Sequence, residues 1–376
     1  MNRRWTPQEA WAWWDSRPWM MGLNYVPSCT PGYNMYQEDT REEAMKTVLP
    51  ELDLMQEIGF NSVRLSLRLQ WWVLDGDKNL DFLDELFEEF HKRGMGVVPI
   101  LGNDCVGYGR PADINFHRPH GPEKFDLGFH SGHASSPFTG GTEQMYGWSH
   151  WDDDEYRKVC YDWVHAMMKR FSQDPRIDMW DMWNEPGMTN RGGLSIPYLQ
   201  DVFEIARCYD PIAPLTACVW DYPDGYGVDK RAQLEEVARV AIDLSDIITF
   251  HSYLDFDKVQ AEVRMLEREK RPIANTEWLH RIQDNFVQDN LPFYFEKKIG
   301  SYHWGLVAGN SQHYLPWDNI RNNPKLDYTR WQHDIIRQDG KTPYDPEEIA
   351  LFKKFGAMKE QAGAKEARPT FFEAKK

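Results

Sequence analysis

The sequence predicts an α/β protein, a single-domain (β/α)8 TIM barrel with long loops over the carboxyl ends of its strands. Short apolar runs alternate with amphipathic stretches along the chain, and eight such runs can be distinguished. This alternation predicts a parallel sheet, and eight units suit its closure into a barrel. A doubly wound open sheet is the rival, but no glycine-rich phosphate turn follows the first run. A chain of 376 residues fits one large domain.

The expected strands are short apolar runs, several of them rich in β-branched and aromatic residues. They cover residues 19–26, 61–67, 96–101, 177–183, 213–220, 246–251, 272–276 and 300–307. In a parallel barrel the carboxyl ends of all eight strands would meet at one mouth, where barrel enzymes build their active sites.

The expected helices show apolar residues at positions i, i+3, i+4 and i+7. Leu83, Leu86, Phe87 and Phe90 follow this spacing, and Gly94 then supplies a stop signal. The pattern recurs at 164–171, 199–206 and 234–241, is weaker at 259–266, and a closing helix is expected at 346–358. A further helix should carry Leu52 and Met55, with Pro50 near its start.

The barrel is expected to span residues 1–362, followed by a charged tail at 363–376. Residues 103–153 are rich in Gly, Pro, His and Ser and show no regular periodicity. A loop of this length in a compact domain is usually functional, and its position after the third strand would place it over the barrel mouth. A second irregular stretch, 310–330, follows the eighth strand.

Composition and charge exclude some partners. The net charge of −16 disfavours nucleic acid and anionic membranes, since both need a basic patch, and the acidity is typical of a soluble surface. Aromatic residues make up 14% of the chain, with 17 Trp. Part of this excess must form core because large rings bury much area. Sugar-binding clefts also use aromatic faces, so the excess weakly favours a carbohydrate ligand.

The cysteines and the N-terminus indicate a cytoplasmic protein. The chain has five Cys, an odd number without a Cys-x-x-Cys pair, which predicts reduced thiols in a reducing compartment. Its first residues lack the apolar segment of a signal peptide, and no apolar run is long enough to span a membrane.

Two glutamates stand at the ends of expected strands. Glu185 lies in the run Trp-Asp-Met-Trp-Asn-Glu-Pro, just after the expected strand 177–183. Glu277 directly follows the expected strand 272–276, in Asn-Thr-Glu-Trp. In a barrel these two side chains would face each other across the mouth. A carboxyl pair in this arrangement suits glycosidic bond cleavage, in which one group protonates the leaving oxygen and the other attacks the anomeric carbon or activates water.

Other polar and aromatic residues at the expected strand ends are candidates for substrate binding. Arg64 should hydrogen-bond Glu277 and keep it ionised, although it could equally pair with another buried carboxylate. Tyr253 would position the nucleophile, and Trp304 would form an aromatic floor under the sugar, with simple packing as the alternative for both. The candidate set is Asn24, Arg64, Asn103, Asp104, Asn184, Trp220, His251, Tyr253, Trp278 and Trp304.

A metal site is not expected. His117 and His120 are three residues apart in the long loop, as are His130 and His133, and His150 follows. No Cys or acidic ligand set supports this spacing, so a substrate contact or a bystander role is favoured over zinc. The proposed chemistry requires neither a metal nor an organic cofactor.

These motifs resemble the retaining glycoside hydrolases of clan A, most closely the family 5 cellulase-like barrels. The similarity runs from Gly-Leu-Asn-Tyr at 22–25 to Trp304, and Asn184-Glu185-Pro186 is its most specific part. The His-Ser-Tyr at 251–253 and the Asn-Ser-Val-Arg-Leu at 61–65 also match. The sequences at 102–105 and 311–317 depart from typical cellulases and are similar to uncharacterised bacterial cellulase-like proteins.

The resemblance implies a retaining glycosidase acting on equatorial, β-type bonds. Glu185 would be the general acid/base, Glu277 the nucleophile, and Asn184 a partner of the sugar 2-hydroxyl. Retention requires the carboxyl groups to be about 5 Å apart, whereas roughly 6.5–9.5 Å would indicate inversion. We expect exo action on short oligosaccharides or glycosides, because the long loops could close one end of the cleft.

Several alternatives stay open. The chain could be an inactive carbohydrate-binding barrel, an endo-acting β-glycanase or a transglycosylase. A barrel aldolase or isomerase is disfavoured because the expected strands contain no Schiff-base Lys. The identity of the sugar and the oligomeric state do not follow from the sequence.

Overall fold

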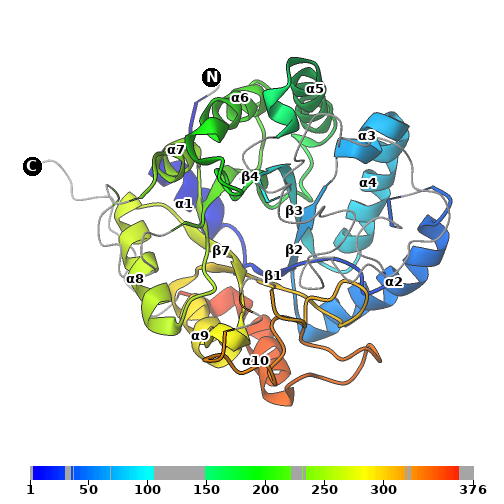
Figure 1. Cartoon of the computed structure of the whole chain (residues 1–376), viewed down its shortest axis with the longest axis vertical. Coiled ribbons are helices and arrows are strands. Elements are labelled where there is room, and N and C mark those ends of the chain that lie inside the picture. Colours follow the sequence, from blue (N-terminus) through cyan, green and yellow to red (C-terminus); the bar gives the residue numbers. More distant parts are fainter. Residues whose placement is uncertain are drawn as a thin grey trace, which may run out of the picture.

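The computed structural model describes residues 3–29, 35–36, 38–67, 69–105, 149–221, 231, 234–317, 320 and 323–363. Its centre is a closed barrel of eight parallel strands in the order β1 to β8, surrounded by helices (Figure 1). This confirms the predicted (β/α)8 fold. The strands are β1 Met21–Asn24, β2 Ser62–Ser66, β3 Gly96–Asn103, β4 Trp180–Asn184, β5 Leu215–Val219, β6 Ile248–His251, β7 Ile273–Trp278 and β8 Gly300–Trp304.

The register closes the barrel without an antiparallel edge. Gly22 of β1 pairs with Ser62 of β2 on one side and with Tyr302 of β8 on the other. Nearly every strand residue is buried, because helices cover the outside and side chains fill the inside. Each strand overlaps a predicted apolar run. A strand that is buried on both faces needs apolar residues at nearly every position, so it appears in the sequence as a continuous apolar run.

Ten helices are present among the described residues. They are α1 Pro7–Asp15, α2 Arg41–Ile58, α3 Leu69–Asp75, α4 Asp77–His91, α5 Asp154–Phe171, α6 Ile196–Arg207, α7 Glu236–Leu244, α8 Phe256–Leu266, α9 Val287–Lys297 and α10 Pro346–Ala357. The periodic segments fall on α4 to α8 and the closing helix on α10. The α1, α3 and α9 helices were not predicted.

Pro50 does not lie near the start of its helix, as we expected from the sequence. The α2 helix begins at Arg41 and continues through Pro50 to Ile58. An internal proline removes one helical hydrogen bond. The buried face nevertheless runs across it, from Val48 to Leu52 and Met55, so packing against the barrel outweighs the lost bond.

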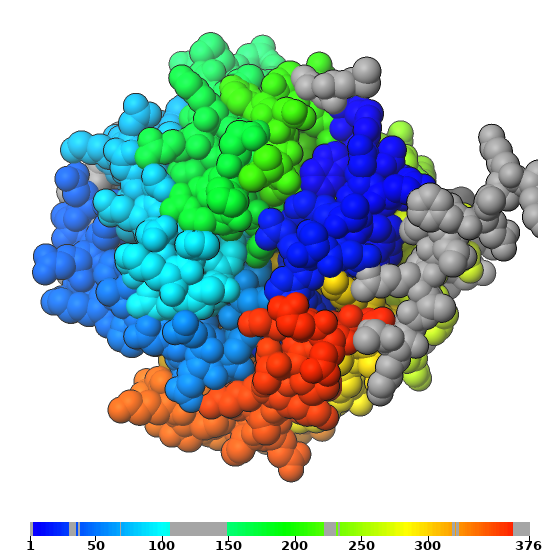
Figure 2. Space-filling model, turned by 180° about the vertical axis from the view of Figure 1, so that it is seen from behind, coloured from blue at the N-terminus to red at the C-terminus, as the bar shows by residue number. Residues whose placement is uncertain are grey.

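The end of the barrel opposite the predicted site is closed by the N-terminal segment. Trp14 of α1 is 2% exposed and packs into a cluster with Met20 just before β1, Met179 just before β4 and Tyr302 of β8. Its indole donates a hydrogen bond to the carbonyl of Lys298 at 3.0 Å. Figure 2 shows this face from behind, with the N-terminal segment beside the C-terminal helix.

Two predictions about loops and boundaries fall mostly outside the described residues. The loop at 103–153 is described only at 103–105 and 149–153, and the tail only at Gly363. The stretch 310–330 forms turns where it is described. Among the described residues, no helix combines the length and hydrophobicity needed to cross a membrane.

Candidate active site

Glu185 and Glu277 meet across the mouth of the barrel. Glu185 directly follows β4, and Glu277 is the fifth residue of the six-residue β7 strand. One carboxylate oxygen from each, together with a ring nitrogen of His251, forms a group of atoms within 4.8 Å of one another. Glu277 is 6% exposed and Glu185 is partly buried. Two carboxyl groups at this separation can act on the two atoms of one bond, one as a proton donor and the other as a nucleophile.

The backbone at Glu185 is strained. Its φ of 45° lies in the left-handed region, which costs a residue with a Cβ about 1–2 kcal/mol. The strained turn is held from both sides: Glu185 N donates to Sγ of Cys218 at 3.1 Å, and the Trp220 indole donates to the carbonyl of Pro186 at 3.0 Å. Strain of this kind persists where surrounding structure fixes it, and such places are often functional sites.

The carboxylate of Glu277 is surrounded by donors. Arg64 Nη1 donates to its Oε1 at 2.7 Å, and the Tyr253 hydroxyl donates to its Oε2 at 2.6 Å. The Trp304 indole also hydrogen-bonds it. Burial alone would raise the pKa of Glu277, but His251, Arg64 and these donors outweigh burial and lower the pKa. Glu277 is therefore held as a carboxylate.

Arg64 connects four strands beneath the two glutamates. Its guanidinium also contacts Asp181 at 2.7 Å, the Asn24 amide oxygen at 2.7 Å and the Asn184 amide oxygen at 2.6 Å. Burial would lower the pKa of Arg64, but the charges of Asp181 and Glu277 raise it, so the cation is permanent. One fully buried cation thus fixes the orientation of both asparagine side chains and of Glu277.

Glu185 has a different set of neighbours. His251 Nδ1 lies 2.7 Å from its Oε1, and the Cys105 thiol donates to its Oε2 at 2.7 Å. The Nε2 atom of His251 has no hydrogen-bond partner in the described part of the chain. Since a buried N–H without an acceptor is rare, we assign the proton to Nδ1, which then donates to Glu185. In contrast to Glu277, this carboxyl is not contacted by a guanidinium in the described part of the chain.

The structure brings most of the predicted substrate-binding residues together. Asn24, Arg64, Asn184, His251, Tyr253 and Trp304 all belong to the hydrogen-bonded group around the two glutamates. Asn103 joins it because its amide oxygen accepts from Asn184 Nδ2 at 3.1 Å. Trp220 is partly buried at the edge of the Glu185 turn.

Trp278 and Asp104 do not face this group, which corrects their place in the candidate set. Trp278 is completely buried, packs against Tyr294 of α9 and donates to Ser301 Oγ, because successive strand residues point to opposite faces. Asp104 is 1% exposed and accepts from the backbone N–H of Gly187 at 2.7 Å. It also pairs with Arg191 at 3.3 Å, so it anchors the turn that carries Glu185.

Three residues of the site were not predicted. Asp181 interrupts the apolar run of β4, and a charged residue in a buried strand is a signal that could have identified it. Cys105, two residues after the end of β3, and Cys218 of β5 contact Glu185. Their contacts depend on residues far apart in sequence, and no local pattern points to them.

The grouping of Glu185, His251 and Glu277 offers ligand atoms for a cation, but Arg64 and Tyr253 already occupy the Glu277 oxygens. A metal would have to displace these donors, so the residues fit one poorly. Four of the five histidines considered from the sequence, His117, His120, His130 and His133, lie outside the described residues. His150 is described, and burial lowers its pKa to about 4.

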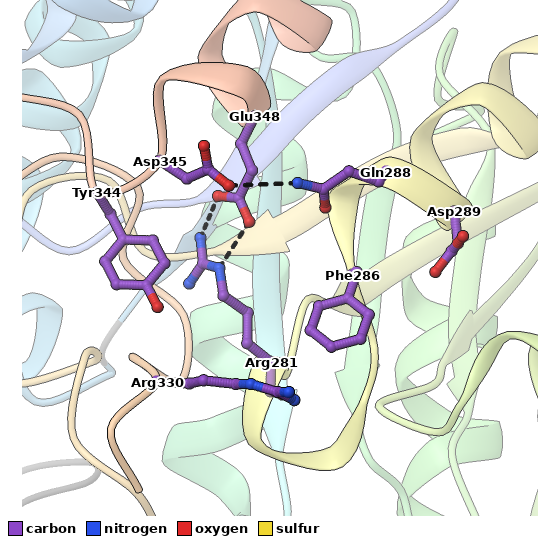
Figure 3. A pocket seen from close by; sticks show the side chains of 8 residues that line it. All are labelled: Arg281, Phe286, Gln288, Asp289, Arg330, Tyr344, Asp345 and Glu348. Carbon is purple, nitrogen blue, oxygen red and sulfur yellow. Dashed lines mark hydrogen bonds and ion pairs between the residues drawn. The ribbon is translucent and has the colours of Figure 1, made fainter. Parts of the chain in front are cut away.

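A separate pocket of about 350 Å³ lies where α9 and α10 begin (Figure 3). Its wall contains the buried ion pair of Arg281 with Glu348, and Gln288 hydrogen-bonds Asp345 beside it. None of the candidate site residues lines this pocket. The ion pair joins the segment after β7 to the C-terminal helix.

Comparison with solved structures returns the same barrel. An endo-β-1,4-mannanase from Thermotoga petrophila aligns with a TM-score of 0.57 at 12% identity, covering 94% of this chain and 79% of that one. A glycoside hydrolase family 5 mannosidase from Rhizomucor miehei aligns with 0.55 at 14% identity, covering 90% and 93%. The exo-β-1,4-mannosidase Op5Man5 from Opitutaceae bacterium strain TAV5 aligns with 0.53 at 16% identity, covering 92% and 60%.

No family model matches the chain, and no curated protein matches its sequence. At identities of 12–16% the structural matches establish a shared fold.

Proposed function

We propose that the protein is a retaining glycoside hydrolase, similar to the family 5 barrels of clan A, that cleaves β-type glycosidic bonds. One observation carries the proposal: carboxylate oxygens of Glu185 and Glu277 lie within 4.8 Å of each other across the barrel mouth. Retaining enzymes hold their two carboxyl groups about 5–5.5 Å apart, and inverting enzymes need roughly 6.5–9.5 Å for a water molecule.

The different surroundings of the two glutamates support different roles for them in the proposed reaction. Glu277, paired with Arg64, attacks the anomeric carbon while the bond to the leaving oxygen breaks. Glu185 gives its proton to that oxygen, and the leaving group departs as an alcohol. In the second step Glu185 takes a proton from water, the water oxygen attacks the anomeric carbon, and Glu277 is released as a carboxylate.

The neighbouring residues are proposed to bind the reacting sugar. Arg64 donates a hydrogen bond to the amide oxygen of Asn184 and so fixes the orientation of this side chain. In this orientation Asn184 is proposed to contact the sugar 2-hydroxyl. Tyr253 positions Glu277, and Trp304 provides an aromatic surface under the ring. Asn24, Asn103, His251 and Trp220 complete the proposed site, in which Asn24 acts by orienting Arg64.

A β-mannoside is the first substrate class to test. The solved structures with this fold include proteins named as mannanases and mannosidases, both endo- and exo-acting. We propose exo action on short oligosaccharides or glycosides. We also propose that the protein works in a reducing compartment, since Cys105 and Cys218 contact Glu185 as free thiols.

The test is turnover of a panel of aryl β-glycosides (mannoside, glucoside, galactoside, xyloside) and matching short oligosaccharides, with Glu277→Gln as the control. NMR of the first product formed reads its stereochemistry. Initial release of the β-anomer, lost in the variant, supports the proposal. Initial release of the α-anomer contradicts retention. Binding without turnover of any substrate would favour the inactive carbohydrate-binding barrel.

A further inference from the structure

The two oxygens of Glu185 are held by donors of unequal strength. Oε1 faces the ring nitrogen of His251 and Oε2 faces the thiol of Cys105, each at 2.7 Å. A thiol is a weak hydrogen-bond donor, whereas an imidazole N–H is a strong one. Oε2 of Glu185, which faces the thiol, is therefore the more basic of the two oxygens and the preferred site for a proton.

Cys105 is itself fixed in place. Its backbone N–H donates to the Asn103 amide oxygen at 2.8 Å, and its sulfur accepts from Asn184 Nδ2 at 3.2 Å. Burial, together with the nearby Glu185 and Glu277, holds the pKa of the Cys105 thiol well above its ordinary value. The sulfur consequently stays an S–H group at neutral pH and does not compete as an anion.

We propose that Cys105 is a positioning residue that holds Oε2 of Glu185 as the oxygen that carries and delivers the catalytic proton. This rests on the proposed function, because it assigns Glu185 as the acid. When Oε2 is protonated, the sulfur can accept the same hydrogen until the leaving oxygen arrives. His251 keeps Oε1 in place throughout.

Other groups around Glu185 bear on its proton and must be considered with Cys105. They are Cys218 from β5, His251 from β6, Tyr253 after β6, Glu277 from β7 and, through Glu277, Arg64 from β2. The test therefore changes only the donor at residue 105 and leaves these groups intact.

Cys105→Ser places a stronger donor on Oε2 and Cys105→Ala removes the donor. In Cys105→Ser we expect the alkaline limb of kcat/KM to move to lower pH, because the hydroxyl stabilises the ionised carboxyl. In Cys105→Ala it should move to higher pH. Cys105→Ala should also lose about tenfold in kcat/KM for an alkyl or phenyl glycoside, roughly one hydrogen bond. The loss should be smaller for a dinitrophenyl glycoside, which needs no acid.

Cys208→Ser is the control, since Cys208 is an exposed free thiol at the end of α6. A second readout needs no turnover: the carbon-13 resonance of the Glu185 carboxyl is titrated in wild type and Cys105→Ser, with Glu185→Gln to assign it. Identical titration curves and identical pH limbs would overturn the inference. A displaced titration in an enzyme that turns over no glycoside would support the positioning role while contradicting the proposed function.

Discussion

Arg64 and Asp181 form an ion pair in which neither side chain is exposed, with 2.7 Å between Nη2 and Oδ2. This pair lies beneath Glu277, which takes a second contact from the same guanidinium. One cation thus serves two carboxylates, whereas Glu185 is contacted by the His251 imidazole and the Cys105 thiol. The arrangement agrees with the proposed roles, in which Glu277, whose pKa is lowered, is the nucleophile and Glu185 is the acid/base.

Removal of Glu185, the proposed acid/base, should have effects that differ from removal of Glu277, the proposed nucleophile. Glu185→Ala is expected to lower kcat for a phenyl glycoside by about 10²–10⁴-fold, the range of general acid–base catalysis. Added azide should restore turnover of a dinitrophenyl glycoside and form the β-glycosyl azide, because attack on the glycosyl–Glu277 intermediate retains configuration. NMR of the azide product checks this. The exposed Glu204→Ala is the control, and α-azide from Glu185→Ala would reverse the assigned roles.

Loss of the Tyr253 hydroxyl should change the acid side of the pH profile. The hydroxyl donates to Glu277 and helps to lower the pKa of this carboxyl. In Tyr253→Phe that pKa should rise, so the acidic limb of kcat/KM should move to higher pH. Activity at the optimum should fall about tenfold, equivalent to one charge-assisted hydrogen bond. A lower kcat with an unmoved acidic limb would show that Tyr253 acts on the sugar instead.

Asp104 should matter for stability and for activity together. Asp104→Asn removes a buried charge partner of Arg191 and weakens the anchor at Gly187. We expect the free energy of unfolding to fall by about 3 kcal/mol, as for other buried pairs that lose one partner. Urea unfolding measures this, with Asp154→Asn, whose side chain is 92% exposed, as the control. Unchanged kcat in a destabilised but folded variant would show that the contacts of Asp104 stabilise the fold without determining the position of Glu185.

Glu262 should make the protein less stable as the pH rises. Its side chain is 2% exposed in α8, and burial raises its pKa to about 8. The folded protein thus keeps a proton that the unfolded chain loses near the ordinary pKa of 4.5. The stability associated with protonated Glu262 is complete below pH 4.5 and is lost as the pH rises towards 8.

Glu262→Gln should remove this dependence. The variant should match wild type near pH 4 and exceed it by a few kcal/mol at pH 8, because each pKa unit corresponds to about 1.4 kcal/mol. Urea unfolding at both pH values measures the difference. The solvent-exposed Glu57→Gln serves as the control. Parallel stability curves for Glu262→Gln and wild type would mean that Glu262 is ionised in the fold.

The sequence was sufficient for the barrel because its strands are buried on both faces and its longer helices on one. Burial on both faces gives a continuous apolar run, and burial on one helix face gives apolar residues at i, i+3 and i+4. The short helix α3 carries only one buried residue, Trp71, too few for a period to be recognised. The preference of proline for the first turn of a helix predicted a helix start near Pro50. This was wrong, because α2 begins at Arg41 and its packing against the barrel keeps it helical through Pro50.

The sequence indicated which strand-end residues the barrel brings together, but the prediction did not take side-chain direction into account. Glu277 and Trp278 are adjacent, yet only Glu277 points into the mouth. Alternation along a strand implies this difference, and applying it would have excluded Trp278. Cys105 could not be found in that way, because its contact with Glu185 is made between loops that the barrel brings together.

The left-handed backbone at Glu185 has a consequence for directed evolution. Glycine and asparagine adopt this conformation at lower cost than glutamate, so either one at position 185 should relax the turn and resist heat better. Selection for thermal tolerance alone would therefore favour variants that lack the proposed proton donor. Any stability screen on this protein needs a simultaneous selection for turnover, because substitutions at residue 185 that raise thermal stability are expected to lower activity.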